Sequence, residues 1–439
     1  MDYYYDDYYD EYYDHPDQLA ARILQRDLSM EETIKNCVHP SIRFATQYIT
    51  NFIAINLLFS ILVLLSRYTP CNGHFIDGYP ELADTELLEP SPDTWNRIRG
   101  TQMILLMKAL SLAFDTEENH SLRSQLGVLS YSGYILCPAN IILGPWIAFS
   151  DYLTIWKVSS GIEPKHSRPS SPGRRILIHV FRVVVSALMA VGFLLTSNCM
   201  IDYLLAPIAS WKWVQAYGKA LAFRTSHYFI GYLSQCSMIA AAVDWNRAED
   251  ERSMMLPVSS LYRVTSPTAV EFPRSLVQVV TAWNIPMHLW LKRYIFRTTK
   301  RPFGTATAIA LTYIISSLLH GLHYRLWVTL LTIGSWTFVE HELRKKLATI
   351  YSACVLVGKC PDTCPAHQHK RNSLFSIVIN SLFFALNAFN LTYLGCIFDS
   401  SEGPPDEAHQ EKSLFGGWAE LNYASHWLLV FAYLFYFVI

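Results

Sequence analysis

Charged side chains are scarce in this sequence. Only 16% of its 439 residues are Asp, Glu, Lys or Arg, whereas 51% are hydrophobic. A soluble domain usually carries about a quarter charged residues, so the composition argues against one. Several apolar runs are roughly 17–25 residues long, which is the length that crosses a bilayer. The sequence therefore predicts an integral membrane protein with several spans.

The chain also lacks an excess of either charge and a secretory leader. Its formal net charge is −1, so no positive field favours nucleic acid as a partner. The N-terminal segment MDYYYDDYYDEYYDHPDQL is acidic and rich in tyrosine. It has no basic stretch followed by an apolar one, which excludes a signal peptide. We interpret this segment as a disordered tail on the cytosolic side.

Cysteines are few for the length, and their spacing is not that of a secreted disulfide framework. Most of the nine lie in or beside apolar segments, so we expect buried thiols. The exception is the loop GKCPDTCPAHQHKR, residues 358–371, where Cys360, Cys364, His367 and His369 offer four metal ligands in ten residues. The spacing differs from a standard zinc finger. A structural zinc, S-palmitoylation of the thiols and an inert loop all remain possible.

The apolar runs predict an all-helical, polytopic fold. Two segments, 97–114 and 275–296, are apolar but interrupted by charges, so we expect interfacial or re-entrant helices there. Hydropathy predicts about eight spans, near residues 51–67, 126–150, 176–205, 214–243, 304–320, 324–341, 374–396 and 424–439.

Loop charges predict the orientation in the membrane. The loops 157–175 and 342–372 are basic, as is the pair Lys300–Arg301, whereas 397–423 is acidic. Because basic loops stay in the cytosol, the acidic loop is expected on the opposite, lumenal face. The hairpin formed by the spans at 304–320 and 324–341 then points its tip toward the lumen.

A histidine ends an otherwise uncharged helix at this tip. His320 follows ALTYIISSLL and lies 16 residues beyond Gly304, or roughly 24 Å at 1.5 Å per residue. Ionisable groups at such depth are costly, and a neutral imidazole is a competent general base. The alternative is a structural histidine that hydrogen-bonds to the backbone or to Ser316 or Ser317.

A second polar residue interrupts the stretch WNIPMHLW, residues 283–290. Proline restricts the residue before it and removes a backbone donor, so Pro286 predicts a bend or break in the helix. Asn284 beside this break, with Trp283 and Trp290, is one way to line a pocket. An interfacial aromatic belt with a capping asparagine is the alternative.

Taken together, the two stretches resemble the membrane-bound O-acyltransferase family, whose asparagine and histidine match Asn284 and His320. Further stretches are similar to its branch of protein-serine O-acyltransferases that act on Wnt proteins. They include RGTQMILLMKALSLAFD (99–115), GPWIAFSDY (144–152), SSLLHGLHYRL (316–326) and WAELNYASHW (418–427).

This resemblance implies a fold and a domain organisation. Transmembrane and re-entrant helices are expected to surround a central tunnel. The acyltransferase core is expected at 95–439. It would follow a disordered tail and lead-in at 1–45 and a front part at 46–94. This front part has one span and a polar loop, so it is shorter than the family usually has.

The resemblance also implies an activity. We expect transfer of a palmitoleoyl group from acyl-CoA, as co-substrate, to a serine of Wnt proteins in the endoplasmic reticulum membrane, in support of Wnt secretion and signalling. His320 is the expected base and Asn284 the expected oxyanion donor, with Trp283, Pro286 and Trp290 at the substrate. No further cofactor is required for this chemistry, and the other partners would be membrane lipids.

Two other functions are compatible with the same residues. A family member that acylates a lysophospholipid or another small acceptor would use the same asparagine and histidine. A membrane transporter, from a different class, would also have broken helices and buried polar groups, but it predicts inverted repeats. The two halves of this sequence show no self-similarity.

Overall fold

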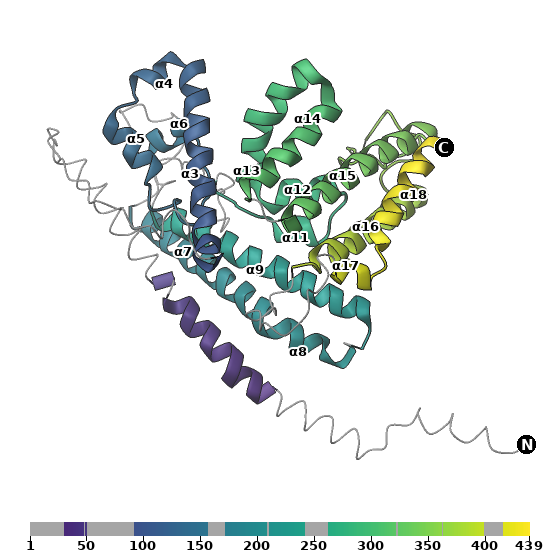
Figure 1. The fold of residues 1–439 in the computed structure, drawn as a ribbon, viewed down its shortest axis with the longest axis horizontal. Coiled ribbons are helices and arrows are strands. Elements are labelled where there is room, and N and C mark those ends of the chain that lie inside the picture. Colours follow the sequence, from purple (N-terminus) through teal and green to yellow (C-terminus); the bar gives the residue numbers. More distant parts are fainter. Residues whose placement is uncertain are drawn as a thin grey trace, which may run out of the picture.

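The computed structural model describes five parts of the chain: residues 30–50 except 48, 92–156, 172–241 except 209, 262–398 except 322, 323 and 362, and 416–439. Within these parts the chain is helical, apart from loops and one isolated backbone bridge between Ala353 and His369. Figure 1 shows the helices side by side in a broad bundle, with α3 to α6 at one end and α15 to α18 at the other. The predicted all-helical class is confirmed.

One helix lies along α7 and α8, and the four that follow it form one end of the bundle (Figure 1). Residues 30–47 are helical and include the π-helical turn η1 (Ile34–Val38). The helices that follow are α3 (Pro92–Glu118), α4 (His120–Ser124), α5 (Val128–Ile135) and α6 (Phe149–Trp156). The span predicted at 126–150 is therefore wrong, because α5 and α6 are separate. Pro138 and Pro145 interrupt helical hydrogen bonding between them, and the resulting loop turns at Gly144, whose φ is +79°.

Two long helices form the base of the bundle. They are α7 (Pro172–Leu195), which continues through η3 (Thr196–Met200), α8 (Ile201–Leu205) and η4 (Ala206–Ile208), and α9 (Lys212–Ala240). Leu194 of α7 packs with Phe229 and Leu233 of α9 in a buried cluster. This pairing agrees with the spans predicted at 176–205 and 214–243.

The predicted break before Pro286 is confirmed. Helix α11 (Pro267–Glu271) is followed by α12 (Leu276–Trp283), which ends at Asn284, and α13 (Ile285–Trp290) begins directly after it. The chain continues through η5 (Leu291–Phe296) into α14 (Arg297–Leu319), which kinks at Gly304. Asn284 has non-helical backbone angles, with φ −137° and ψ 89°.

The C-terminal helices pack against this broken segment. They are α15 (Tyr324–Ile350), α16 (Leu374–Gly395), α17 (Gly416–Glu420) and α18 (Ala424–Val438). Helices α14 and α15 form the predicted hairpin, and they approach closely because Gly334 has no side chain. A Cβ at that position would lie 2.9 Å from the ring of Tyr313.

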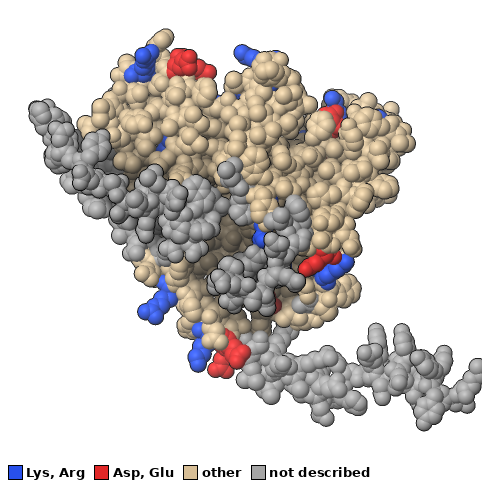
Figure 2. All heavy atoms as spheres, viewed as in Figure 1, with Lys and Arg blue, Asp and Glu red and all other residues tan. Residues whose placement is uncertain are grey.

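Fewer helices than the predicted eight meet a strict length and hydropathy criterion for a span. Among the described residues three do, namely Ile176–Ile208, Ile285–Leu319 and Leu374–Gly395, and Ala424–Val438 is a shorter apolar helix. The predicted span at 51–67 lies outside the described residues. Helices α9 and α15 are long enough, but buried Arg224, Glu340 and Arg344 lower their hydropathy. Figure 2 shows the visible charged side chains mainly at two opposite ends, with an uncharged belt between them.

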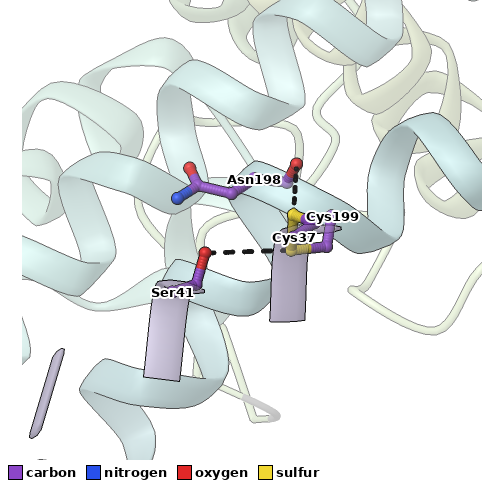
Figure 3. The surroundings of a disulfide bond; sticks show 4 residues. All are labelled: Cys37, Ser41, Asn198 and Cys199. Carbon is purple, nitrogen blue, oxygen red and sulfur yellow. Dashed lines mark hydrogen bonds between the residues drawn. A yellow bond between two sulfur atoms is a disulfide. The ribbon is translucent and has the colours of Figure 1, made fainter. Parts of the chain in front are cut away.

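A disulfide joins two distant segments, although buried thiols were expected for most of the cysteines. Cys37 in η1 and Cys199 in η3 are bonded across 162 residues, with Ser41 and Asn198 beside them (Figure 3). Among the described residues, six other cysteines are free and buried, as expected. The sequence could not reveal the pair because only the fold brings η1 to the end of α7.

The disulfide bears on the predicted topology. Helix α7 starts after the basic loop 157–175, so its far end, which carries Cys199, is expected on the lumenal face. Disulfides persist in the oxidising lumen, so the bond agrees with that orientation. With that orientation, Cys37 in η1 is expected on the same face as Cys199, because the bond holds the two residues together.

Candidate active site

A small apolar cavity of about 40 Å³ lies where four segments meet. Its walls are hydrophobic except for one side-chain amide, that of Asn284. The lining residues come from α3 (Met103, Ile104, Met107), the loop before α6 (Leu143, Gly144, Pro145, Trp146), the start of α13 (Asn284, Pro286, Met287) and Val264. Such a surface suits an apolar ligand that is oriented by a single polar contact.

A buried lysine holds the loop that forms one wall. The Nζ of Lys108 donates to the carbonyl of Tyr134 at 2.8 Å and to Oδ1 of Asn140 at 2.7 Å. Asn140 in turn donates to the carbonyl of Pro145 at 3.1 Å. Lys108 is fully buried, so these acceptors replace the water it has lost. Its position fixes the loop against α3.

Asn284 caps α13 with one end of its side chain. Its Oδ1 accepts a hydrogen bond from the backbone N–H of Met287 at 3.1 Å, as expected of an asparagine at a helix N-cap. The backbone N–H of Ile285 donates to the carbonyl of Val264 at 2.8 Å. The cap uses Oδ1 and not Nδ2, so the amide remains able to donate to a ligand in the cavity.

The two predicted tryptophans do not line the cavity but contact the segments that form it. The ring of Trp283 stacks on His227, with ring centroids 4.1 Å apart, and Nε2 of His227 lies 2.8 Å from the carbonyl of Trp283. Trp290 is buried and donates to the carbonyl of Met107 at 3.0 Å. Of the three predicted substrate-binding residues, only Pro286 lines the cavity.

His227 is a residue that the sequence analysis missed. It lies within the long apolar helix α9, which is the same signal that singled out His320. Its stacking and hydrogen-bonding partner is Trp283, which directly precedes Asn284. His227 therefore holds the backbone at the break between α12 and α13.

His320 lies at the C-terminal end of α14. Its side chain is half-buried, and the helix stops there because Gly321 adopts a φ of +85°. The preceding residue, Leu319, packs in the same hydrophobic cluster as Met287 and Trp290. His320 is not a lining residue of the cavity, but the helix end that carries it packs against the segment that Asn284 caps.

The cysteine-rich loop between α15 and α16 gathers four potential metal ligands. The ligand atoms of Cys354, Cys360, Cys364 and His367 all lie within 4.8 Å of one another. Nδ1 of His367 is 3.3 Å from the sulfur of Cys364 and 3.7 Å from those of Cys354 and Cys360. Three cysteines and one histidine form a set that holds structural zinc in proteins, so this cluster could hold zinc.

The cluster differs from the predicted ligand set at one residue. His369 lies outside the cluster, because its backbone pairs with Ala353 and Cys354 and its ring packs on Phe375. Cys354 takes its place. The sequence analysis missed Cys354 because it ends an apolar run, whereas the backbone bridge folds it back onto the loop.

The surroundings of the cluster act on its thiols in different ways. The hydrogen bond with His367 lowers the pKa of Cys364 to about 7. Burial raises the pKa of Cys354 to about 12. A bound cation would favour the thiolate of each cysteine.

Comparison with known proteins gives a consistent result. A profile of the membrane-bound O-acyltransferase family matches residues 15–350. The chain is 74% identical to the protein-serine O-palmitoleoyltransferase porcupine of Anopheles gambiae, with 100% of each chain covered. It is 34% identical to the Homo sapiens protein of that name, over 88% of this chain and 83% of the relative.

More distant likeness extends to a different acceptor class. The chain is 25% identical to lysophospholipid acyltransferase 2 of Arabidopsis thaliana, over 59% of this chain and 61% of the relative. The alignment to the Anopheles protein has 496 positions against 439 residues, so about 57 of its positions have no residue in this chain.

Proposed function

The chain belongs to the membrane-bound O-acyltransferase family, and on that premise we propose that it transfers a palmitoleoyl group from coenzyme A to a serine of a Wnt protein. The observation that carries this proposal is its 74% identity over the full chain to a protein-serine O-palmitoleoyltransferase. Identity to a lysophospholipid acyltransferase is only 25%, which favours a protein acceptor over a small one. Family membership favours an enzyme over a transporter.

In this proposal His320 is the general base. Its imidazole accepts the proton of the serine hydroxyl as the oxygen attacks the thioester carbonyl. The new ester C–O bond forms, the C–S bond breaks, and the proton passes to the departing thiolate of coenzyme A. Base assistance of this kind contributes about 10²–10⁴ in rate, or roughly 3–5 kcal/mol. The burial of the helix end at Leu319 supports a site with little water.

Asn284 stabilises the negative charge that develops on the carbonyl oxygen. Its Nδ2 donates to this oxyanion, while Oδ1 stays bonded to the N–H of Met287. Because the cap fixes the amide in advance, little reorganisation is needed when the charge appears. One such donor contributes about 2.7–4 kcal/mol in other acyl-transfer sites.

The apolar cavity beside Asn284 accepts part of the acyl chain. Its lining from α3 and the loop at 143–146 is hydrophobic, and each buried methylene contributes about 0.8 kcal/mol. We propose that this cavity is part of the central tunnel expected for the family, and that the acyltransferase core spans residues 95–439.

The two substrates reach the site from opposite faces of the endoplasmic reticulum membrane. Coenzyme A is bulky, anionic and cytosolic, so it enters on the face of the basic loops. The Wnt protein folds in the lumen and approaches from the end of α14 that carries His320. In this scheme protein side chains perform the chemistry, and a zinc ion at the Cys354–His367 cluster is structural.

An acyl-transfer assay on the full-length protein tests the proposal. Membranes containing the wild type are incubated with a clickable palmitoleoyl-CoA analogue and a Wnt-derived peptide, with a serine-to-alanine peptide as the blank. We expect labelling of the serine peptide alone. Labelling of a lysolipid without the peptide would overturn the protein acceptor.

The same assay tests the base. His320→Ala is compared at equal expression with His341→Ala, which removes an exposed histidine of α15. We expect a loss of about 10²-fold or more for His320→Ala and none for the control. Full activity of His320→Ala would remove the histidine from the mechanism.

A further inference from the structure

The cysteine-rich loop is connected by hydrogen bonds to the helix that leads to Asn284. We infer that a zinc ion bound by Cys354, Cys360, Cys364 and His367 holds this loop closed and thereby fixes the start of α12 through Arg274 and Arg344. This metal-held support goes beyond the acyl transfer proposed above. It rests on that function only for the importance of Asn284.

The donor set itself points to zinc. Three thiols and an imidazole satisfy a tetrahedral ion completely and leave no open position, which is the arrangement of structural zinc sites. The loop already brings them together, because the backbone N–H of Cys354 donates to the carbonyl of His369 and that of His369 to the carbonyl of Ser352, both at 2.9 Å. On binding, each thiol gives up its proton to solvent and the ion takes the sulfur lone pair.

Burial of the thiols argues against acylation. Cys354 is fully buried, and Cys360 and Cys364 are only 8% and 5% exposed. An acylating reagent or enzyme needs access to the sulfur, and the low exposure of these cysteines restricts that access. The basic residues around the loop place it in the reducing cytosol, which disfavours a disulfide.

Two arginines donate hydrogen bonds to the backbone carbonyls of three successive loop residues. Arg274 donates from Nε to the carbonyl of Leu356 at 3.1 Å and from Nη2 to that of Cys354 at 3.0 Å. Arg344, which is fully buried, donates from Nη1 to the carbonyl of Val355 at 2.9 Å. One of the three residues, Cys354, is itself a metal ligand, so the ion and the arginines act on the same stretch of backbone.

The arginines continue the connection to α12. Arg344 pairs with Glu340 at 2.7 Å and also donates to the carbonyl of Arg274. The other oxygen of Glu340 accepts the backbone N–H of Leu276 at 2.7 Å. Leu276 is the first residue of α12, and Asn284 follows its last residue, about 12 Å further along the helix axis. The loop and the capping asparagine therefore lie at opposite ends of one short helix.

Loss of the metal would release this support. Without it the three thiols are no longer held together, and the carbonyls that accept from Arg274 and Arg344 move with them. A buried guanidinium that loses its acceptors is unfavourable, so the start of α12 rearranges. We expect α12 to become less protected, whereas α9, which packs against α7 in a buried cluster, should change little.

Metal content and thiol protection test the site directly. The full-length protein, purified in detergent, is analysed for zinc by mass spectrometry and for alkylation by a maleimide before and after a chelator. We expect about one zinc per chain and three cysteines that react only after chelation. The double variant Cys360→Ser/Cys364→Ser should hold less than about a tenth of that zinc.

Two controls separate this set from its alternatives. His369→Ala removes the histidine outside the cluster and should retain the zinc, as should Cys396→Ser, which alters a buried thiol elsewhere. Absence of zinc from the wild type, thiols that react without chelation, or a hydroxylamine-sensitive acyl group on Cys360 or Cys364 would each overturn the site.

Hydrogen exchange tests the support of α12 without any acyl-transfer assay. Zinc removal should speed amide exchange in residues 276–284 several-fold and leave the centre of α9 unchanged. Arg274→Lys should retain zinc and yet show the fast exchange at 276–284 already, with little further change on chelation. Unchanged exchange in α12 after zinc loss would overturn the support, whether or not the protein proves to be an acyltransferase.

Discussion

Asn284 has two separable roles at the scale of a single side chain. Oδ1 caps α13 through the N–H of Met287, and Nδ2 is the proposed oxyanion donor. An alanine substitution removes both, so it cannot distinguish a catalytic effect from a structural one. Aspartate keeps an oxygen for the cap and removes the donor.

We predict that Asn284→Asp folds like the wild type and transfers no acyl group. Asn284→Ala should be equally inactive and less stable by about 0.5–2 kcal/mol, because an N-cap is lost. Thermal unfolding in detergent and the peptide assay measure the two effects. Substantial activity of the aspartate variant would contradict the oxyanion role.

His227 contacts Trp283, the residue directly before Asn284. Its Nε2 lies 2.8 Å from the carbonyl of Trp283, and its ring stacks on the indole. We predict that His227→Phe, which keeps a stacking ring and loses the hydrogen bond, lowers kcat roughly tenfold, since about 1.4 kcal/mol corresponds to a factor of ten in rate. A positioning role requires the KM for the peptide to change little, and partial recovery is expected for His227→Gln.

The sequence predicts the place of some residues in the candidate sites and not that of others. Asn284 and Pro286 could be predicted because a proline restricts the backbone of the residue before it, and so breaks the helix whatever the tertiary fold. Cys354 and His227 were missed because their partners are tertiary. The thiol joins its cluster only through the bridge of Ala353 to His369, and the histidine meets Trp283 only because α9 crosses α12.

At the scale of elements, the loop before α6 shapes one wall of the cavity. Gly144 has a φ of +79°, and a Cβ there would lie 3.1 Å from Cδ1 of Ile104. We predict that Gly144→Ala destabilises the protein by about 1–2 kcal/mol through backbone strain and lowers acyl transfer by narrowing the cavity. Unfolding and activity measurements check both effects, with Gly173→Ala, where nothing lies within 4 Å, as control. Wild-type activity would show that this wall does not contact the substrate.

The same loop explains why one predicted span failed. Hydropathy is averaged over a window, so the apolar residues of 126–150 give the profile of one continuous span. Its two prolines and the hydrogen bonds from Lys108 hold the chain as a loop instead. The break at Asn284, by contrast, was predicted because proline and asparagine adjoin within an interrupted helix.

At the scale of the whole molecule, the disulfide joins the first described helix to the end of α7. A cross-link between two residues that are 162 positions apart in the sequence removes considerable entropy from the unfolded chain. Such bonds typically contribute about 2–4 kcal/mol to the free energy of unfolding. We predict that Cys37→Ser lowers the Tm and adds one thiol, the buried Cys199, that a maleimide labels once the unreduced protein is unfolded. Cys137→Ser, at a buried free cysteine, is the matched control for the labelling. A chain whose Cys37 and Cys199 are both alkylated without reduction would contradict the bond.

The distribution of sulfur over the two faces has a practical consequence for anyone who extracts this protein. In the orientation expected from the loop charges, the bilayer separates the Cys37–Cys199 bond from the thiols of the Cys354–His367 cluster, whereas a detergent solution exposes both to the same redox conditions. A strong reductant added to protect the cluster thiols will also reduce the Cys37–Cys199 bond. Without a reductant, cluster thiols that lose their metal will exchange with that bond. Preparations are best kept near neutral pH with trace zinc and without thiols, so that each sulfur stays in the state its own side of the membrane gave it.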